Sequence, residues 1–232
     1  MRTTTFVAAV AALTFSTVAS AGGNVIHFTG AGPIPDGPTV AVPIYGAPLV
    51  MTATVADPDV IERITLSITM SHGRVGDLNV QLNFQPAGSS SVTSCQILDR
   101  LGAPTPSSPG AGSNLNGTYV FTASADPIWD AALAIGSSSV VPGGLYQGHT
   151  NTLNGFSLGR DLEACFPNAT AAGTWTLVFK DAFNLEAGSV QSASLLIIAR
   201  PPQCITDING DGPVDTTDLI LFLSRFGQTC TP

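Results

Sequence analysis

Strict alternation of apolar and polar residues recurs along most of the chain and limits the fold more than any other feature. The clearest runs are ITLSITMS (64–71), DLNVQLNF (77–84) and TWTLVFK (174–180). A period of two places alternate residues on opposite faces of a strand, so each run predicts a strand with one buried face. Three further runs are predicted strands: VAVPIY (40–45), LVMTATV (49–55) and SVQSASLLII (189–198).

Turn-forming clusters separate these runs, for example SHGRVGD (71–77) and DAFNLEAGS (181–189). No sustained helical periodicity interrupts the pattern from residue 24 to 199. Many strands at short spacing are typical of an all-β fold, here a jelly-roll-like β-sandwich. Residues 101–117 and the glycine-rich segment 140–156 are expected to be surface loops.

The N-terminus has the features of a secretory signal peptide over residues 1–21. Arg2 supplies a positive charge, the segment from Phe6 to Phe15 is apolar, and Ala19-Ser20-Ala21 is a small-residue cleavage site. The apolar segment is much shorter than the roughly 20 residues of a membrane-spanning helix. We therefore expect an exported protein, secreted or in the cell envelope, without a membrane span.

The charge balance excludes some classes of partner. The formal net charge is −8, with 16 acidic residues against 8 basic ones. An acidic chain of this kind is not expected to bind nucleic acid or an anionic membrane. A protein partner in the extracellular space or cell envelope, or a polysaccharide, is compatible with it.

The four cysteines are Cys95, Cys165, Cys204 and Cys230. An even number in an exported chain predicts disulfides, and four cysteines allow three connectivities. Because Cys204 and Cys230 bracket the acidic C-terminal segment, we pair them with each other and Cys95 with Cys165. The wide spacings and the lack of a CxxC motif argue against metal ligation by these thiols.

A proline-rich segment, ARPPQ (199–203), marks a change of composition. Tandem prolines stiffen a chain and fit neither a helix interior nor a central strand. We therefore predict a sandwich over 24–199, a linker at 200–203 and a separate small unit over 204–230.

The most specific motif of this small unit is DINGDGPVDTTD (207–218). Its oxygen-bearing residues occupy the ligand positions of an EF-hand calcium loop, which supplies the six to eight hard oxygens that calcium prefers. The predicted ligands are the side chains of Asp207, Asn209, Asp211, Asp215 and Asp218 and the backbone carbonyl of Pro213. Gly212 permits the sharp turn at position six, and Val214 at position eight is expected to face a hydrophobic neighbour.

A short amphipathic helix is predicted after the loop. Leu219, Phe222, Leu223 and Phe226 recur at helical spacing, with Asp215 or Thr216 as the N-cap and Gly227 at the end. Loop and helix together resemble a single dockerin type I repeat, including an aspartate at position twelve. Dockerins carry two such repeats and bind cohesin modules. With one repeat, the apolar helix face is expected to rest on the sandwich, on a second chain or on an external partner.

The sandwich resembles the P/Homo B domain, a β-sandwich that follows the catalytic domain of subtilisin-like proprotein convertases. The resemblance covers about residues 40–199. It depends on three segments that occur in the family's order: GDL (76–78), GGLYQG (143–148) and AGTWTLVFKDAFNLEAGSVQSASLLI (172–197). The turns depart from the family pattern, since QPAGSS stands where a Ser-Pro-Ser-Gly turn is usual.

The same resemblance implies a second calcium site at Asp77 and Asp181. The alternative is that these aspartates only accept hydrogen bonds from turn amides, as aspartate readily does. In the second of the two turns, KDAFNLEAG, only Asp181 and Gly188 match the family well.

No catalytic residues are assigned. A serine hydrolase needs a positioned histidine and an oriented acid, and no G-x-S-x-G segment occurs. His27, His72 and His149 are all expected at the surface or in loops. Trp175 alternates with Leu177 and is expected in the core, whereas Trp129 could be exposed.

The sequence thus predicts an exported, non-catalytic interaction or accessory module with a calcium-dependent C-terminal docking motif. One alternative is a carbohydrate-binding module of a polysaccharide-degrading system, although aromatic residues make up only 7% of the chain. Another is an accessory domain of a serine-type endopeptidase system.

Overall fold

The computed structural model describes residues 23–38, 44–56, 59–152, 157–200, 208–209 and 214–225. Most of this part is β-strand and helices are few, which confirms the all-β prediction. The strands are β1 (Gly23–His27), β2 (Gly32–Ile34), β3 (Leu49–Val55), β4 (Val60–His72), β5 (Leu78–Pro86), β6 (Thr93–Asp99), β7 (Asn114–Phe121), β8 (Val140–Val141), β9 (Gly144–Tyr146), β10 (Gly148–Asn151), β11 (Ser157–Arg160), β12 (Gly173–Asp181) and β13 (Gly188–Arg200). The helices are η1 (Val75–Asp77), α1 (Ile128–Ile135), α2 (Leu162–Cys165) and α3 (Thr216–Arg225).

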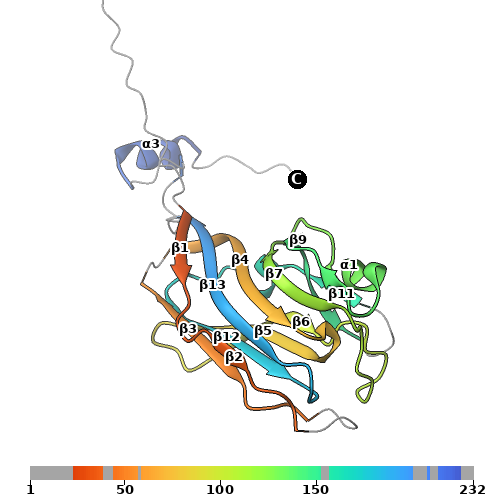
Figure 1. Ribbon diagram of the computed structural model, residues 1–232. Coiled ribbons are helices and arrows are strands. Elements are labelled where there is room, and N and C mark those ends of the chain that lie inside the picture. Colours follow the sequence, from red (N-terminus) through yellow and green to blue (C-terminus); the bar gives the residue numbers. More distant parts are fainter. Residues whose placement is uncertain are drawn as a thin grey trace, which may run out of the picture.

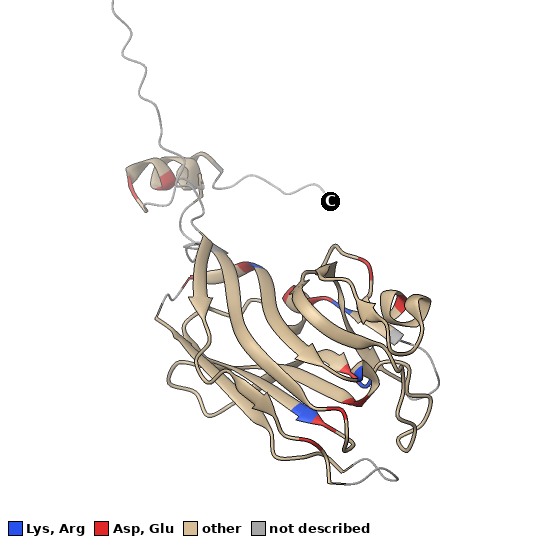
Figure 2. Cartoon of the chain, viewed as in Figure 1, with Lys and Arg blue, Asp and Glu red and all other residues tan. Residues whose placement is uncertain are grey.

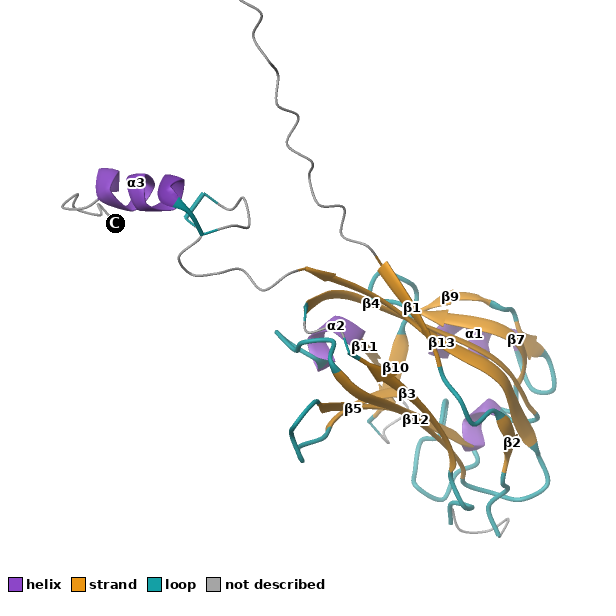
Figure 3. Ribbon diagram, turned by 90° about the vertical axis from the view of Figure 1, so that its left-hand side faces the viewer, coloured by secondary structure: helices purple, strands orange, loops and turns teal. Residues whose placement is uncertain are grey.

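Two sheets form the body of the sandwich (Figures 1 and 3). The larger has the order β1-β13-β4-β7-β8, with β2 beside β13 and β9 beside β7, and the smaller has the order β3-β12-β5-β6. Within the described residues, β8 and β9 run parallel to their neighbour β7, and the other paired strands are antiparallel. A hairpin of β10 and β11 forms a third, two-stranded sheet.

The apolar faces of the two sheets meet in one core. Along β4, the inward residues Ile64, Leu66 and Ile68 are fully buried, as the alternation predicts. From the opposite sheet, Trp175 stacks on Phe84 with ring centroids 4.3 Å apart. Trp175 is fully buried, which confirms its predicted place in the core.

Several predicted boundaries are wrong. The segment 140–156 is not simply a loop, because it contains β8, β9 and β10, and β7 already begins at Asn114. Conversely, Ile44 and Tyr45 are not in a strand. β1 and β2 are additional strands, and β13 extends to Arg200, one residue into the predicted linker. The unpredicted strands (β1, β2, β8, β9 and β10) are too short or too mixed in composition for a period of two to be recognised. Hydrogen bonding to neighbouring strands, and not their own sequence pattern, makes them strands.

Helix α1 is the longest of three helices that the sequence analysis missed in the described part of residues 24–199; the other two are η1 and α2. It has only eight residues and buries Ile128, Trp129 and Ala132. Trp129 is 5% exposed, so the expectation that it could be exposed is wrong. Two helical turns are too few to give a clear period, but their apolar residues are enough to cover one end of the core.

The Cys95–Cys165 disulfide is present, with an S–S distance of 1.98 Å, and confirms that predicted pairing. It joins β6 of the smaller sheet to α2. Cys204 and Cys230 lie outside the described residues, as do the predicted signal peptide and the prolines of the linker.

Charged residues are sparse on the strands and lie mostly at strand ends and in loops (Figure 2). None of the helices in the described part of the chain is long and apolar enough to span a membrane.

Candidate functional site

The C-terminal helix begins as the sequence predicts. The side chain of Asp215 accepts a hydrogen bond from Thr217 N at 2.7 Å, so Asp215 is the N-cap of α3. The helix runs from Thr216 to Arg225. Phe226 and Gly227, the predicted end of the helix, lie outside the described residues.

Asp218, at position twelve of the loop, gathers three backbone amides. Its Oδ1 accepts from Ile208 N at 2.7 Å and from Asn209 N at 3.2 Å, and its Oδ2 accepts from Asp215 N at 2.8 Å. The hydrogen bond from the Asp215 amide, together with those from Asn209 and Ile208, lowers the pKa of the Asp218 carboxyl. The carboxylate is therefore ionised and links position twelve to positions two, three and nine.

The charge and the oxygen atoms of the Asp218 carboxylate suit a calcium ion, but the described residues of this loop do not form a group of three or more acidic side chains that could hold a metal. Two lone pairs of Oδ1 are taken by amides, and Oδ2 keeps one lone pair. Asp218 can therefore offer one oxygen, where the glutamate usual at position twelve offers two. Asn209 and Asp215 are exposed, and Asp207, Asp211 and Pro213 lie outside the described residues.

Apolar side chains around the loop are exposed. Val214 is 53% exposed, so the expectation that it faces a hydrophobic neighbour is wrong in this structure. On α3, the large apolar side chains that are half exposed or more are Leu219, Ile220, Phe222 and Leu223. The exposed surface of this ten-residue helix is therefore largely apolar. An isolated helix of this length is only marginally stable in water, so a partner surface would stabilise it.

The second pair of predicted ligands lies inside the sandwich. Asp181, at the end of β12, is fully buried. Its Oδ2 lies 3.0 Å from His72 Nε2, and its Oδ1 accepts from Phe183 N at 3.1 Å. Because Arg74 N donates to His72 Nδ1 at 3.1 Å, the ring hydrogen is on Nε2 and is donated to Asp181.

Asp77, in η1, is also buried and has a cationic neighbour. Its Oδ1 lies 3.8 Å from Arg74 Nε, and Arg74 also lies 4.0 Å from Glu186 Oε1. Burial raises the pKa of Asp77 to about 7, although Arg74 opposes the shift. The two carboxylates thus face His72 and Arg74 of the chain itself. Among the described residues, no group of three or more His, Cys, Asp or Glu is placed to hold a metal. A second calcium ion at Asp77 and Asp181 stays a prediction.

Two of the three histidines are not where the sequence analysis placed them. His27 is exposed, but His72 is 2% exposed and His149 is fully buried. His149, on β10, lies beside Trp129 with ring centroids 5.2 Å apart, and burial lowers its pKa to about 4. Polar and glycine neighbours on either side of His149 gave no signal of burial, because β10 has no periodic pattern of its own.

The His72–Asp181 pair is a structural contact. One ring nitrogen of His72 bonds Asp181 and the other accepts from the backbone of Arg74, so neither remains to activate a nucleophile. The pair joins the end of β4 to the end of β12, and therefore one sheet to the other.

No protein-family model matches the chain, and no match appears among curated proteins. Among solved structures, the chain is similar to a serine protease of Aeromonas sobria, seen alone and in a complex with a chaperone. In each case the TM-score is 0.37 and the sequence identity is 15%, over 77% of this chain and 27% of the protease chain. The chain thus spans about a quarter of the length of these structures.

Proposed function

We propose that this protein is an exported, non-catalytic interaction or accessory module. Its sandwich, with a jelly-roll-like arrangement of the P/Homo B type, carries a C-terminal calcium loop and helix that dock onto a partner protein outside the cell or in its envelope. The observation that carries this proposal is the position of Asp218. An ionised carboxylate at position twelve is held against the amides of positions two, three and nine.

This geometry supports a role for calcium at the start of α3. In a calcium loop, the ion draws the acidic side chains of positions one to twelve onto one centre. That centre fixes the start of α3, because Asp215 caps the helix and Asp218 lies in its first turn. Calcium would therefore set the orientation in which Leu219, Phe222 and Leu223 are presented to a partner.

Calcium titration of the full chain by isothermal calorimetry tests the loop. The Asp207→Ala/Asp211→Ala variant is expected to lose binding, because it removes two of the acidic ligands. The Asp126→Ala/Asp130→Ala variant removes the same charge near α1 and is expected to bind calcium as the unmodified chain does. Undiminished binding by the loop variant would contradict the calcium assignment.

The docking part is tested separately, by comparing the envelope proteins retained by the chain with and without residues 204–232, in calcium and in chelator. An identical set of proteins under all four conditions would remove docking from the proposal while leaving calcium binding intact.

The carbohydrate-binding alternative is less well supported. Sugar-binding modules stack sugars on exposed aromatic side chains. Both tryptophans are buried here, which leaves Tyr45 and Phe222 as the large exposed aromatic residues among those described. The other alternative, an accessory domain of a serine-type endopeptidase system, would be a particular case of the proposed accessory role. It depends on the sequence resemblance to the P/Homo B domain.

A further inference from the structure

A cavity of roughly 500 Å³ lies beside the Cys95–Cys165 disulfide. Both cysteines line it, together with Gln96 of β6, Arg160 of β11 and Ala164 of α2. Ligand pockets commonly have volumes of about 300–1,000 Å³, so this cavity has room for a small molecule. The disulfide is therefore not enclosed by the core on all sides.

The two cysteines of the disulfide differ in exposure. Cys95 pairs with Leu82 in the smaller sheet and is 1% exposed. Cys165 is the last residue of α2 and is partly exposed. A thiolate attacks the disulfide sulfur that it can reach, and the rate of exchange depends on this access. The geometry therefore directs attack to Cys165 and makes Cys95 the leaving group.

The charges of the cavity suit an incoming thiolate. Among the described residues that line it, Arg160 is the only cation, and its Nε donates to Thr150 Oγ1 at 2.6 Å. No carboxylate in the described part of the chain pairs with Arg160 within 4.0 Å. The neighbouring Asp161 carboxylate already accepts from the amides of Glu163 and Ala164 through its Oδ1, at 2.9 and 3.3 Å. Arg160 can therefore attract a thiolate and stabilise the negative charge on the exchanging sulfurs.

The segment that follows the disulfide is held by contacts of its own. Phe166 is 2% exposed, and its ring centroid lies 5.1 Å from that of Trp175 in the core. Ile61 N of β4 donates to Ala169 O at 2.9 Å. We therefore expect this segment to stay on the sandwich when the covalent link is opened, so that opening needs no unfolding of the strands.

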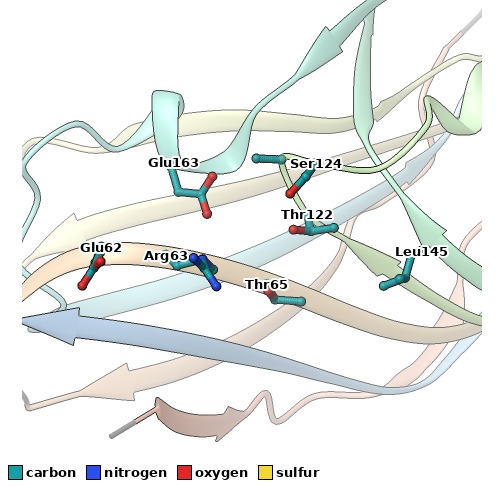
Figure 4. Close-up of a pocket in the computed structure, with 8 residues that line it drawn as sticks. Glu62, Arg63, Thr65, Thr122, Ser124, Leu145 and Glu163 are labelled. Carbon is teal, nitrogen blue, oxygen red and sulfur yellow. The ribbon is translucent and has the colours of Figure 1, made fainter. Parts of the chain in front are cut away.

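Helix α2 is also bonded to the larger sheet. Glu163 extends from α2 toward Arg63 of β4, across a second cavity of roughly 600 Å³ that Glu62 also lines (Figure 4). The Oε1 of Glu163 accepts a hydrogen bond from Ile64 N at 3.2 Å. This contact does not involve the cysteines, so it remains when the disulfide is broken.

We propose that Cys165 is a site of thiol–disulfide exchange with a small thiol in the folded protein. The thiolate of the small molecule attacks Cys165 Sγ and forms a mixed disulfide with it. The Cys95–Cys165 bond breaks, and the Cys95 thiolate takes a proton from water. One disulfide is consumed and one is formed, so no further oxidant or reductant is needed.

The modification is reversible. Cys95 is held on β6 beside the mixed disulfide, so its thiolate can attack Cys165 Sγ, release the small thiol and restore the original bond. The inference goes beyond the proposed function and involves neither the calcium loop nor α3.

Incubation of the full chain with 2-mercaptoethanol near about pH 8, in chelator and without oxygen, tests this site. The reaction is stopped early with a maleimide that blocks free thiols. Peptide mapping by mass spectrometry then follows each cysteine separately, so Cys204 and Cys230 do not interfere. We expect the 2-mercaptoethanol adduct on Cys165 and the free thiol on Cys95.

Urea distinguishes exchange in the folded protein from exchange after unfolding. We expect the rate in about 1 M urea to lie within about twofold of the rate in buffer. If unfolding had to come first, the same urea concentration would raise the rate at least about fivefold, because it increases the unfolded fraction.

Two variants assign the exchange to the cavity. Arg160→Gln removes the cation but keeps a side chain that can donate to Thr150, and it is expected to slow the exchange at least about threefold, a typical effect of one nearby charge. Arg63→Gln on β4, the matched control, removes the same charge from the other cavity and is expected to leave the rate unchanged. Thermal unfolding of both variants ensures that a changed rate does not reflect a changed stability.

An adduct on Cys95, no adduct before unfolding, or a fivefold acceleration by urea would overturn the proposal. So would equal rates in Arg160→Gln and Arg63→Gln, because the cavity would then not be the route by which the thiol reaches the disulfide.

Discussion

The sandwich and the C-terminal helix both contain regularly spaced apolar residues, but these residues are buried in the sandwich and exposed on the helix. Trp175 and Leu177 alternate along β12 and are fully buried, whereas Leu219 and Leu223 recur along α3 and remain more than half exposed. The pattern in each case predicts the correct element. Burial depends in addition on an opposing surface, which the larger sheet, including β4, supplies in the sandwich. We therefore expect the stability of the protein to come mainly from the sandwich. The exposed apolar side chains of α3 are instead available for contact with another surface.

The largest expected effect is the difference in unfolding free energy between removing a buried apolar side chain of the sandwich and removing an exposed one of α3. Trp175→Ala is expected to lower the free energy of unfolding by about 3–5 kcal/mol, because the ring stacks on Phe84 and lies 5.1 Å from Phe166. Leu219→Ala is expected to change it by less than about 0.5 kcal/mol, because its side chain is 55% exposed. Urea unfolding of both variants measures this. Similar losses would mean that α3 is packed in solution.

A somewhat smaller effect is expected from the carboxylates. Asp181→Ala leaves His72 Nε2 and Phe183 N without their buried acceptor and is expected to cost about 3 kcal/mol. Asp218→Ala removes three amide contacts from the C-terminal loop and is expected to leave the unfolding of the sandwich unchanged. Calorimetric scans of both variants provide the test, with Asp181→Asn, which keeps one acceptor oxygen, as the intermediate case.

An effect of similar size, which appears only as the pH falls, concerns the acid stability of the sandwich. His149 has a pKa of about 4 in the folded chain, against about 6.5 when unfolded. Below pH 6.5 the imidazole of His149 is protonated in the unfolded state but stays neutral in the folded state, so the free energy of unfolding falls as the pH falls toward 4. The expected loss is up to about 3 kcal/mol. Asp77 acts in the opposite direction, because its raised pKa favours the folded state at low pH.

His149→Phe isolates this contribution. The difference in unfolding free energy between the variant and the unmodified chain cancels the effect of Asp77. Urea unfolding at pH 7, 5.5 and 4 is expected to show a difference that grows in favour of the variant as the pH falls. A difference independent of pH would exclude a buried neutral His149.

The sequence predicted the long strands well and the short elements poorly. Ile64, Leu66, Ile68 and Met70 lie inward as alternation requires, because a strand buried on one face needs no more information than its period. The strands β8, β9 and β10 have two to four residues each, and only their pairing with β7 or β11 defines them.

The candidate site was predictable in its local part only. The calcium loop depends on spacing within twelve residues, and the contacts of Asp218 with Ile208 and Asp215 lie within that span. The pairing of His72 with Asp181 joins residues 109 positions apart. The cavity lined by Glu62, Arg63 and Glu163 likewise depends on long-range pairing, because it lies beside the part of β4 that β7 does not cover. Such contacts between residues far apart in the sequence cannot be predicted from the spacing of residues in a motif.

The Cys95–Cys165 disulfide also has a consequence for the response of the protein to proteolytic cleavage. The two cysteines are 70 positions apart in the sequence, and the segment between them includes the Pro/Gly/Ser-rich loop 101–113. Exposed loops of this kind are where proteases cut first. A cut within that span leaves both pieces joined by the disulfide, so a nicked molecule retains all its strands. It would separate into fragments only after reduction.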